Sequence, residues 1–104
     1  MITVSVLYPA TEGASFDHDY YLDKHIPLLQ EKLGDALKGV RVEKGIGNAM
    51  GGDAPFVAAV HMQFESGDAF GAAMIPHLGE IGGDVANYTT IQPVMQMSEI
   101  VADS

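Results

Sequence analysis

The sequence contains no cysteine, only 5 Lys and Arg residues against 14 Asp and Glu, and no long apolar run. Without cysteine there is no disulfide framework and no thiolate chemistry, which suits a reducing compartment. The formal net charge of -9 repels phosphate backbones and anionic lipid surfaces. No segment approaches the roughly 20 apolar residues that span a bilayer. These absences argue against nucleic-acid and membrane partners.

The length of the chain predicts one domain over residues 1–104, because about 100 residues supply one hydrophobic core. Hydrophobic residues make up 47% of the chain, a share typical of globular proteins and not of disordered ones. The first residues, Met1 to Tyr8, lack the basic region and the small-residue cleavage site of a signal peptide. We therefore expect a cytoplasmic protein whose N-terminus is a strand of the fold.

Alternating apolar and polar residues predict four strands. The expected strands are Ile2–Tyr8, Val40–Lys44, Phe56–Phe64 and Tyr88–Val101. In the third strand Phe56, Ala58, Val60, Met62 and Phe64 form one apolar face. Pro93 has no amide proton for a sheet ladder, so it should confine the last strand to an edge or a bulge.

A first helix is expected to begin near Asp17, whose carboxylate can cap the free amides of the next turn. Phe16 can pack on Tyr21 across this cap as a hydrophobic staple. The apolar stripe that should face the core is Leu22, Ile26, Leu29 and Leu33. Pro27 predicts a kink or short break just after His25.

A second helix should begin after Ser66 and continue past Ile81, with a distortion at Pro76. The element order is then βαββαβ, which predicts a ferredoxin-like α+β fold with two helices on one face of an antiparallel four-stranded sheet. The other face would leave apolar side chains such as Val57 and Ala59 in water. Because a monomer rarely exposes such a patch, we expect a homodimer formed through the sheet.

Three segments resemble the EthD family over nearly the whole length of the chain. They are Phe16-Asp-x-Asp-Tyr-Tyr-x-x-x-His25-x-Pro-Leu, Asp84-Val-Ala-Asn-Tyr-Thr89 and Gln92-Pro-Val-Met-Gln-Met-Ser-Glu99. The resemblance implies a dimeric α+β barrel, in which each protomer keeps a pocket between its sheet and its helices. It also implies a small aromatic or polyketide-like ligand and, as for some relatives, activity without a metal or organic cofactor.

His25 and Tyr21 are the predicted catalytic residues. Asp17, Tyr21 and His25 are spaced by four residues, so they share a stripe of the first helix beside the core. A neutral imidazole with a pKa of about 6.5 can exchange protons with a bound enol or phenol. By resemblance, His25 is also the histidine of the family's Tyr-Tyr-x-x-x-His-x-Pro pattern. Two structural alternatives stay open: His25 bonding a carbonyl freed at Pro27, and Tyr21 serving only as the staple.

The further binding candidates are Asp17, Tyr20, His61, Asp84 and Asn87. Each has a structural alternative. Asp17 is a natural helix cap, and Tyr20 can be a packing residue. His61 lies in the third strand, where it either lines a pocket or is a satisfied polar group. Asp84 and Asn87 match the family's Asp-x-x-Asn-Tyr-Thr motif, but both residue types also form turns.

No metal or cofactor is expected. The four histidines show no H-E-x-x-H or other ligand spacing. The glycines between Gly45 and Gly52 precede a strand where a dinucleotide fingerprint requires a helix, so they predict a flexible hairpin loop. Two hypotheses remain: a cofactor-free acid/base enzyme, and a binding or accessory protein for a partner oxygenase that uses the same pocket. A filled core without a pocket is a third possibility.

Overall fold

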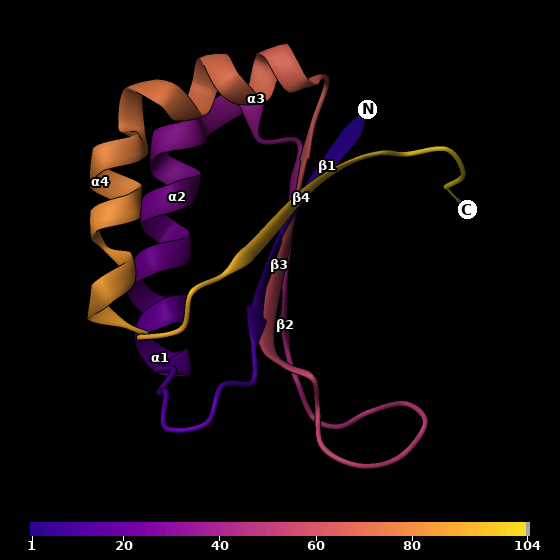
Figure 1. Cartoon of the computed structure of the whole chain (residues 1–104). Helices are drawn as coiled ribbons and strands as arrows, with labels where there is room; N and C mark the ends of the chain where they lie inside the picture. Colours follow the sequence, from indigo (N-terminus) through magenta and orange to yellow (C-terminus); the bar gives the residue numbers. More distant parts are fainter. Residues whose placement is uncertain (104) are drawn as a thin grey trace.

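The computed structural model describes residues 1–103, and over this range helices cover one face of a four-stranded sheet (Figure 1). The strands are β1 (Ile2–Pro9), β2 (Gly39–Lys44), β3 (Phe56–Phe64) and β4 (Val94–Glu99). They lie in the order β2-β3-β1-β4, and every neighbouring pair is antiparallel. The predicted ferredoxin-like α+β fold is confirmed.

The register of the sheet decides which side chains meet the helices. Val6 of β1 pairs with Val60 of β3 and Met95 of β4 on the helix side. Leu7 pairs with Ala59 and Val94, and these three side chains stand on the opposite face. In the part of the chain that the structure describes, no helix covers that opposite face (Figure 1). It is called the open face below.

The first helical segment is capped as predicted but contains a wide turn. Asp17 accepts a hydrogen bond from the Tyr20 amide at 3.0 Å, and the rings of Phe16 and Tyr21 lie 5.1 Å apart. The short helix α1 (His18–Tyr20) leads into the π-helical turn η1 (Tyr21–His25), and α2 (Ile26–Leu33) follows. The irregularity therefore lies before His25 and ends at that residue, whereas Pro27 led us to expect it just after His25. The C-terminal cap is Gly34, whose φ of 54° suits glycine.

The prediction that Leu22 faces the core was wrong, because its side chain is 51% exposed. A π-helical turn holds an extra residue, which rotates the helix relative to a regular α-helical register. Tyr21 and His25 are buried instead, at 1% and 4% exposure. The wide turn thus places a phenol and an imidazole between the helix and the sheet.

The second helical segment follows the prediction. The Ser66 hydroxyl accepts a hydrogen bond from the Ala69 amide at 3.0 Å and caps α3 (Gly67–Met74). At Pro76 the chain tightens into the 3₁₀ turn η3 (Ile75–His77), and α4 (Leu78–Gly83) continues from there. A further 3₁₀ turn, η4 (Val85–Asn87), leads from α4 to Tyr88. In the first helical segment, the 3₁₀ turn η2 (Gly34–Ala36) follows α2.

The last strand is shorter than the expected Tyr88–Val101 segment, since β4 begins only at Val94. Pro93 lies just before it, and β4 is an edge strand as predicted. Residues 88–90 instead lie beside residues 15–17, just before the first helix, with a bridge between Thr89 and Phe16. This course leaves Tyr88 buried at 3% exposure, against the first helical segment.

The core lies between the sheet and the helices, and Phe64 is its most completely buried aromatic residue, with 0% exposure. Its ring packs edge-on against Phe70 of α3 at 5.0 Å. Replacing Phe64 with Ala should lower the free energy of unfolding by about 3–5 kcal/mol, because the substitution removes buried surface and leaves a cavity.

Urea denaturation monitored by circular dichroism measures this loss. The control is Ile46→Ala, since Ile46 is 97% exposed in the loop between β2 and β3 and should change stability by less than about 0.5 kcal/mol. Equal effects of the two substitutions would contradict the described core.

Candidate active site

An apolar cavity of about 460 Å³ lies between the helix side of the sheet and the helices. The sheet contributes Val6, Val60 and Met95 to its wall, while Phe70 and Met74 contribute from α3. The polar side chains of the lining are four: Tyr8, Tyr21, His25 and Tyr88. Their rings are mutual neighbours, with centroids 4.6 to 6.0 Å apart in five of the pairs that they form. The lining of the cavity is therefore mainly apolar, and its four polar side chains form one cluster.

His25 carries the titratable nitrogen of this cluster. Its Nδ1 lies 2.9 Å from Oδ2 of Asp84, and its side chain is 5% exposed. A carboxylate can only accept, so Nδ1 holds the proton in the neutral ring and Nε2 keeps a free lone pair. The unprotonated nitrogen of His25 thus lies on the side of Tyr88.

Asp84 holds His25 in place and is itself held by three donors. Oδ1 accepts from the Tyr20 hydroxyl at 2.6 Å and from the side-chain amide of Asn87 at 3.0 Å, while Oδ2 accepts from His25. Desolvation by burial raises the pKa of Asp84, but the hydrogen bonds from Tyr20, Asn87 and His25 outweigh it and lower that pKa below the ordinary 3.8. Asp84 is therefore ionised at neutral pH and accepts the Nδ1 proton of His25.

The interpretation of Asp84 and Asn87 as turn residues was incomplete. Both do form a turn, since the backbone amide of Asn87 donates to the backbone carbonyl of Asp84 at 3.0 Å. The Asp84 side chain also reaches the first helical segment, about 60 residues earlier in the sequence, where it bonds His25 and the Tyr20 hydroxyl. The Asn87 side chain supports it by donating to the same carboxylate.

Tyr8 and Tyr88 form a pair of phenols beside His25. Their hydroxyl oxygens are 2.7 Å apart, and the Tyr88 oxygen lies 3.5 Å from Nε2 of His25. Desolvation by burial is the main cause that raises the pKa of both phenols above 10.0, so both stay protonated at neutral pH. Sequence reasoning did not select either residue, although Tyr88 stands inside the quoted Asp84–Thr89 motif.

Tyr21 has both of the roles weighed for it. Its ring packs against Phe16, as a staple does, and stacks on the His25 ring at 5.4 Å with planes 16° apart. Burial is the main cause that raises the pKa of Tyr21 far above 10.0. Asp17 does not line the cavity; its carboxylate caps the helix at Tyr20.

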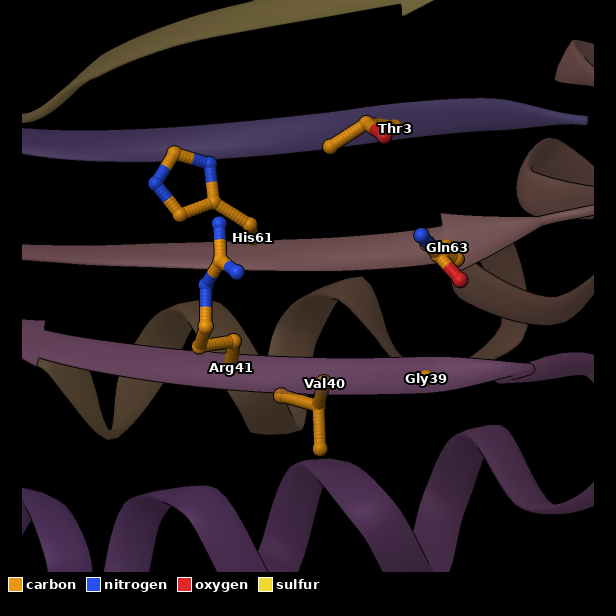
Figure 2. A pocket seen from close by; sticks show the side chains of 6 residues that line it. All are labelled: Thr3, Gly39, Val40, Arg41, His61 and Gln63. Carbon is orange, nitrogen blue, oxygen red and sulfur yellow. The ribbon is translucent and has the colours of Figure 1, made fainter. Parts of the chain in front are cut away.

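His61 lies on the open face, away from the other candidates, because Val60 and Met62 on either side of it face the cavity. Its ring bonds the Ser5 hydroxyl at 2.8 Å and Glu43 at 3.1 Å. Figure 2 shows His61 with Thr3, Arg41 and Gln63 around a shallow hollow on three neighbouring strands. The structure therefore does not bring His61 together with His25.

Across residues 1–103, no three His, Asp or Glu side chains are grouped so that they could hold a metal ion. None of the helices described over the same range is long and apolar enough to cross a membrane.

The Asp84 network makes a prediction about stability. Asp84→Asn should lower the free energy of unfolding near neutral pH by about 2 kcal/mol, since it removes the charge from three hydrogen bonds. The folded pKa of Asp84 lies below 3.8, so the charged network stabilises the fold above that value. The difference between the variant and the unmodified chain should shrink as the pH falls through the folded pKa.

Unfolding curves recorded over a series of pH values measure this difference. Asp23→Asn is the control, because Asp23 is exposed in the same helical segment and should show no such dependence. A deficit that stays constant down to strongly acidic pH would contradict the network.

Comparisons with solved structures indicate the family of the chain. No family model and no curated protein matches the chain. Among solved structures, the chain is similar to an EthD-like protein from Ralstonia eutropha JMP134, with 48% identity, a TM-score of 0.92, and coverage of 99% of this chain and 94% of that one.

Two more distant structures share the fold. An ethyl tert-butyl ether d (EthD) family protein from Bacillus halodurans C-125 is 21% identical, with a TM-score of 0.75 and coverage of 95% and 97% of the two chains. A dimeric ferredoxin-like protein from an uncultured marine organism is 8% identical, with a TM-score of 0.52 and coverage of 100% and 98%. The match to the EthD-like protein covers nearly the whole chain at 48% identity and confirms the prediction from the sequence motifs: the chain belongs to the EthD family.

Proposed function

We propose that the chain is an acid/base enzyme that binds a small aromatic or polyketide-like molecule in the apolar cavity, with His25 as the base. The observation that carries this proposal is the hydrogen bond from buried His25, at the polar end of an otherwise apolar cavity, to the partly buried carboxylate of Asp84 behind it. A histidine that only satisfied a carbonyl near Pro27 would need no carboxylate partner. Here Asp84 fixes the tautomer that keeps Nε2 basic.

The reaction supported best is a proton transfer that rearranges the ligand. Nε2 takes a proton from an acidic O–H or from a C–H next to a carbonyl, and the bonding electrons stay on the ligand as a phenolate or enolate. The imidazolium that forms is stabilised by ionised Asp84. Returning the proton to another atom of the ligand completes a tautomerisation and restores His25. Such a reaction is redox-neutral, so it needs no cofactor.

The apolar walls contribute to this chemistry. They exclude water from the ligand, and electrostatic interactions are stronger in such surroundings than in bulk solvent. Tyr21 orients the imidazole by stacking on it. The arrangement places the base, its carboxylate and a bound ring in fixed positions.

The alternative is a protein that binds such a ligand without converting it, as an accessory to a partner oxygenase. The apolar lining, which needs only a few polar anchors to hold a ligand, favours this second candidate. The two functions differ in whether the lone pair of Nε2 removes a proton or only accepts a hydrogen bond.

Exchange of deuterium into 2-tetralone, a bicyclic ketone with acidic C–H bonds, separates the two functions. Followed by NMR in deuterium oxide, the exchange should be faster with the protein than in buffer. His25→Gln should slow the catalysed rate by at least about a hundredfold while 2-tetralone still binds. His77→Gln is the control, since His77 lies in η3 outside the cavity lining. Binding without faster exchange would support the accessory function.

We also propose that two protomers associate through their open faces. The cross-strand row of Ala59, Leu7 and Val94 is apolar, and Val94 is 51% exposed. The structural similarity to a dimeric ferredoxin-like protein supports this arrangement. The polar residues of the open face, among them His61 and Glu43, would then lie between the two sheets.

Sedimentation at micromolar concentration should give twice the mass of one chain. Val94→Lys should shift the mass to that of a monomer, because a lysine in the apolar row would lose its hydration on association. Leu22→Lys is a matched control: Leu22 is also 51% exposed, but it lies on the first helical segment. A dimer that tolerates Val94→Lys and dissociates with Leu22→Lys would place the interface on the helices.

A further inference from the structure

The free lone pair of His25 Nε2 and the hydroxyl of Tyr88 are poorly matched to each other. They are 3.5 Å apart, which is at the long limit for a hydrogen bond, whereas Tyr88 and Tyr8 are 2.7 Å apart. Both His25 and Tyr88 are nearly inaccessible to solvent, at 4% and 3% exposure. A buried acceptor whose only hydrogen-bond contact is this long favours a ligand that donates a shorter hydrogen bond to it.

The bond to Asp84 sets the role of the His25 nitrogens at this gap, whereas either hydroxyl of the Tyr8–Tyr88 pair can donate to the other. His25 Nδ1 donates to Asp84, so Nε2 can only accept. Burial keeps the phenols of Tyr8 and Tyr88 protonated, since it raises the pKa of both. When Tyr8 donates to the Tyr88 oxygen, the proton of Tyr88 is free for an oxygen in the cavity. The gap thus presents one acceptor and one donor side by side.

We infer that the site selects an uncharged, hydroxyl-bearing ligand, a phenol or an enol, whose oxygen donates to Nε2 of His25 and accepts from the hydroxyl of Tyr88. This inference rests on the proposed function and deepens it by assigning Tyr88 a role in ligand selection. A hydroxyl group is the oxygen function that donates and accepts at one atom. An ether oxygen can only accept, so it leaves Nε2 without a partner.

The charges at the site disfavour a carboxylate ligand. Ionised Asp84 stands behind His25, and the described residues that line the cavity include no Lys or Arg. A carboxylate would lose its hydration in an apolar space without gaining a cation, which is costly. The rest of the ligand must be apolar to match walls such as Val60, Phe70 and Met74.

Four naphthalene probes of similar shape test the inference by titration calorimetry near neutral pH: 2-naphthol, 2-methoxynaphthalene, naphthalene and 2-naphthoate. 2-Naphthol should bind about tenfold or more tightly than the ether and naphthalene, and 2-naphthoate should bind weakest. Tyr88→Phe should weaken the binding of 2-naphthol and of 2-methoxynaphthalene relative to naphthalene, because it removes the hydroxyl that donates to both oxygens. His77→Gln is the control, since His77 lies in η3 outside the cavity lining and its substitution should leave the affinities for all four probes unchanged.

The outcomes separate this inference from the proposed function. If the unmodified chain binds all four probes equally, or binds 2-naphthoate best, the selection of a hydroxyl ligand is wrong and the cavity remains a binding site. If Tyr88→Phe, folded by circular dichroism, binds 2-naphthol and 2-methoxynaphthalene as tightly relative to naphthalene as the unmodified chain does, the assignment to Tyr88 is wrong. If none of the four probes binds at all, both the inference and the proposed function fail.

Discussion

The hydrogen bond between His25 and Asp84 connects the two helical segments at the polar end of the cavity, and the candidate site depends on it. The two residues are 59 positions apart in the sequence, yet Nδ1 and Oδ2 lie 2.9 Å from each other. The bond sets the tautomer of the imidazole, directs its free nitrogen toward Tyr88, and gives a partly buried carboxylate a partner. Tyr20 and Asn87 complete the partners of that carboxylate, so four polar side chains satisfy one another in a largely apolar region.

The backbone of the first helical segment makes this bond possible. A regular helix through Leu22, Ile26 and Leu29 would present an aliphatic stripe to the sheet. The π-helical turn over Tyr21–His25 instead buries Tyr21 and His25 and leaves Leu22 exposed. Because π-helical turns are rare and occur frequently at functional sites, the turn is itself consistent with the site described. Pro27, which cannot donate to the turn before it, lies two residues after His25 and suits this irregular geometry.

The sequence predicted the fold well, since period-two strands, the caps at Asp17 and Ser66 and the prolines are local signals. It also selected His25 and Tyr21 correctly as residues of the pocket wall. It could not place Leu22, because hydrophobic periodicity assumes a uniform helix. It could not join Asp84 to His25 or find the Tyr8–Tyr88 pair, since these contacts depend on how distant segments pack. His61 was expected at a pocket only as one of two options, and strand alternation alone left open which sheet face it takes.

The two faces of the sheet have different chemistry. The helix side holds an apolar cavity lined by one histidine and three tyrosines, whereas the open face carries a mixed set of polar and apolar residues. The central claim is that Asp84 holds the Nδ1 proton of His25, which leaves the lone pair at Nε2 on the side of Tyr88. Nitrogen-15 NMR of the imidazole rings at neutral pH tests it most directly. The account predicts that the protonated nitrogen of His25 is Nδ1 and the unprotonated one is Nε2; a ring protonated at Nε2 and free at Nδ1 would contradict it.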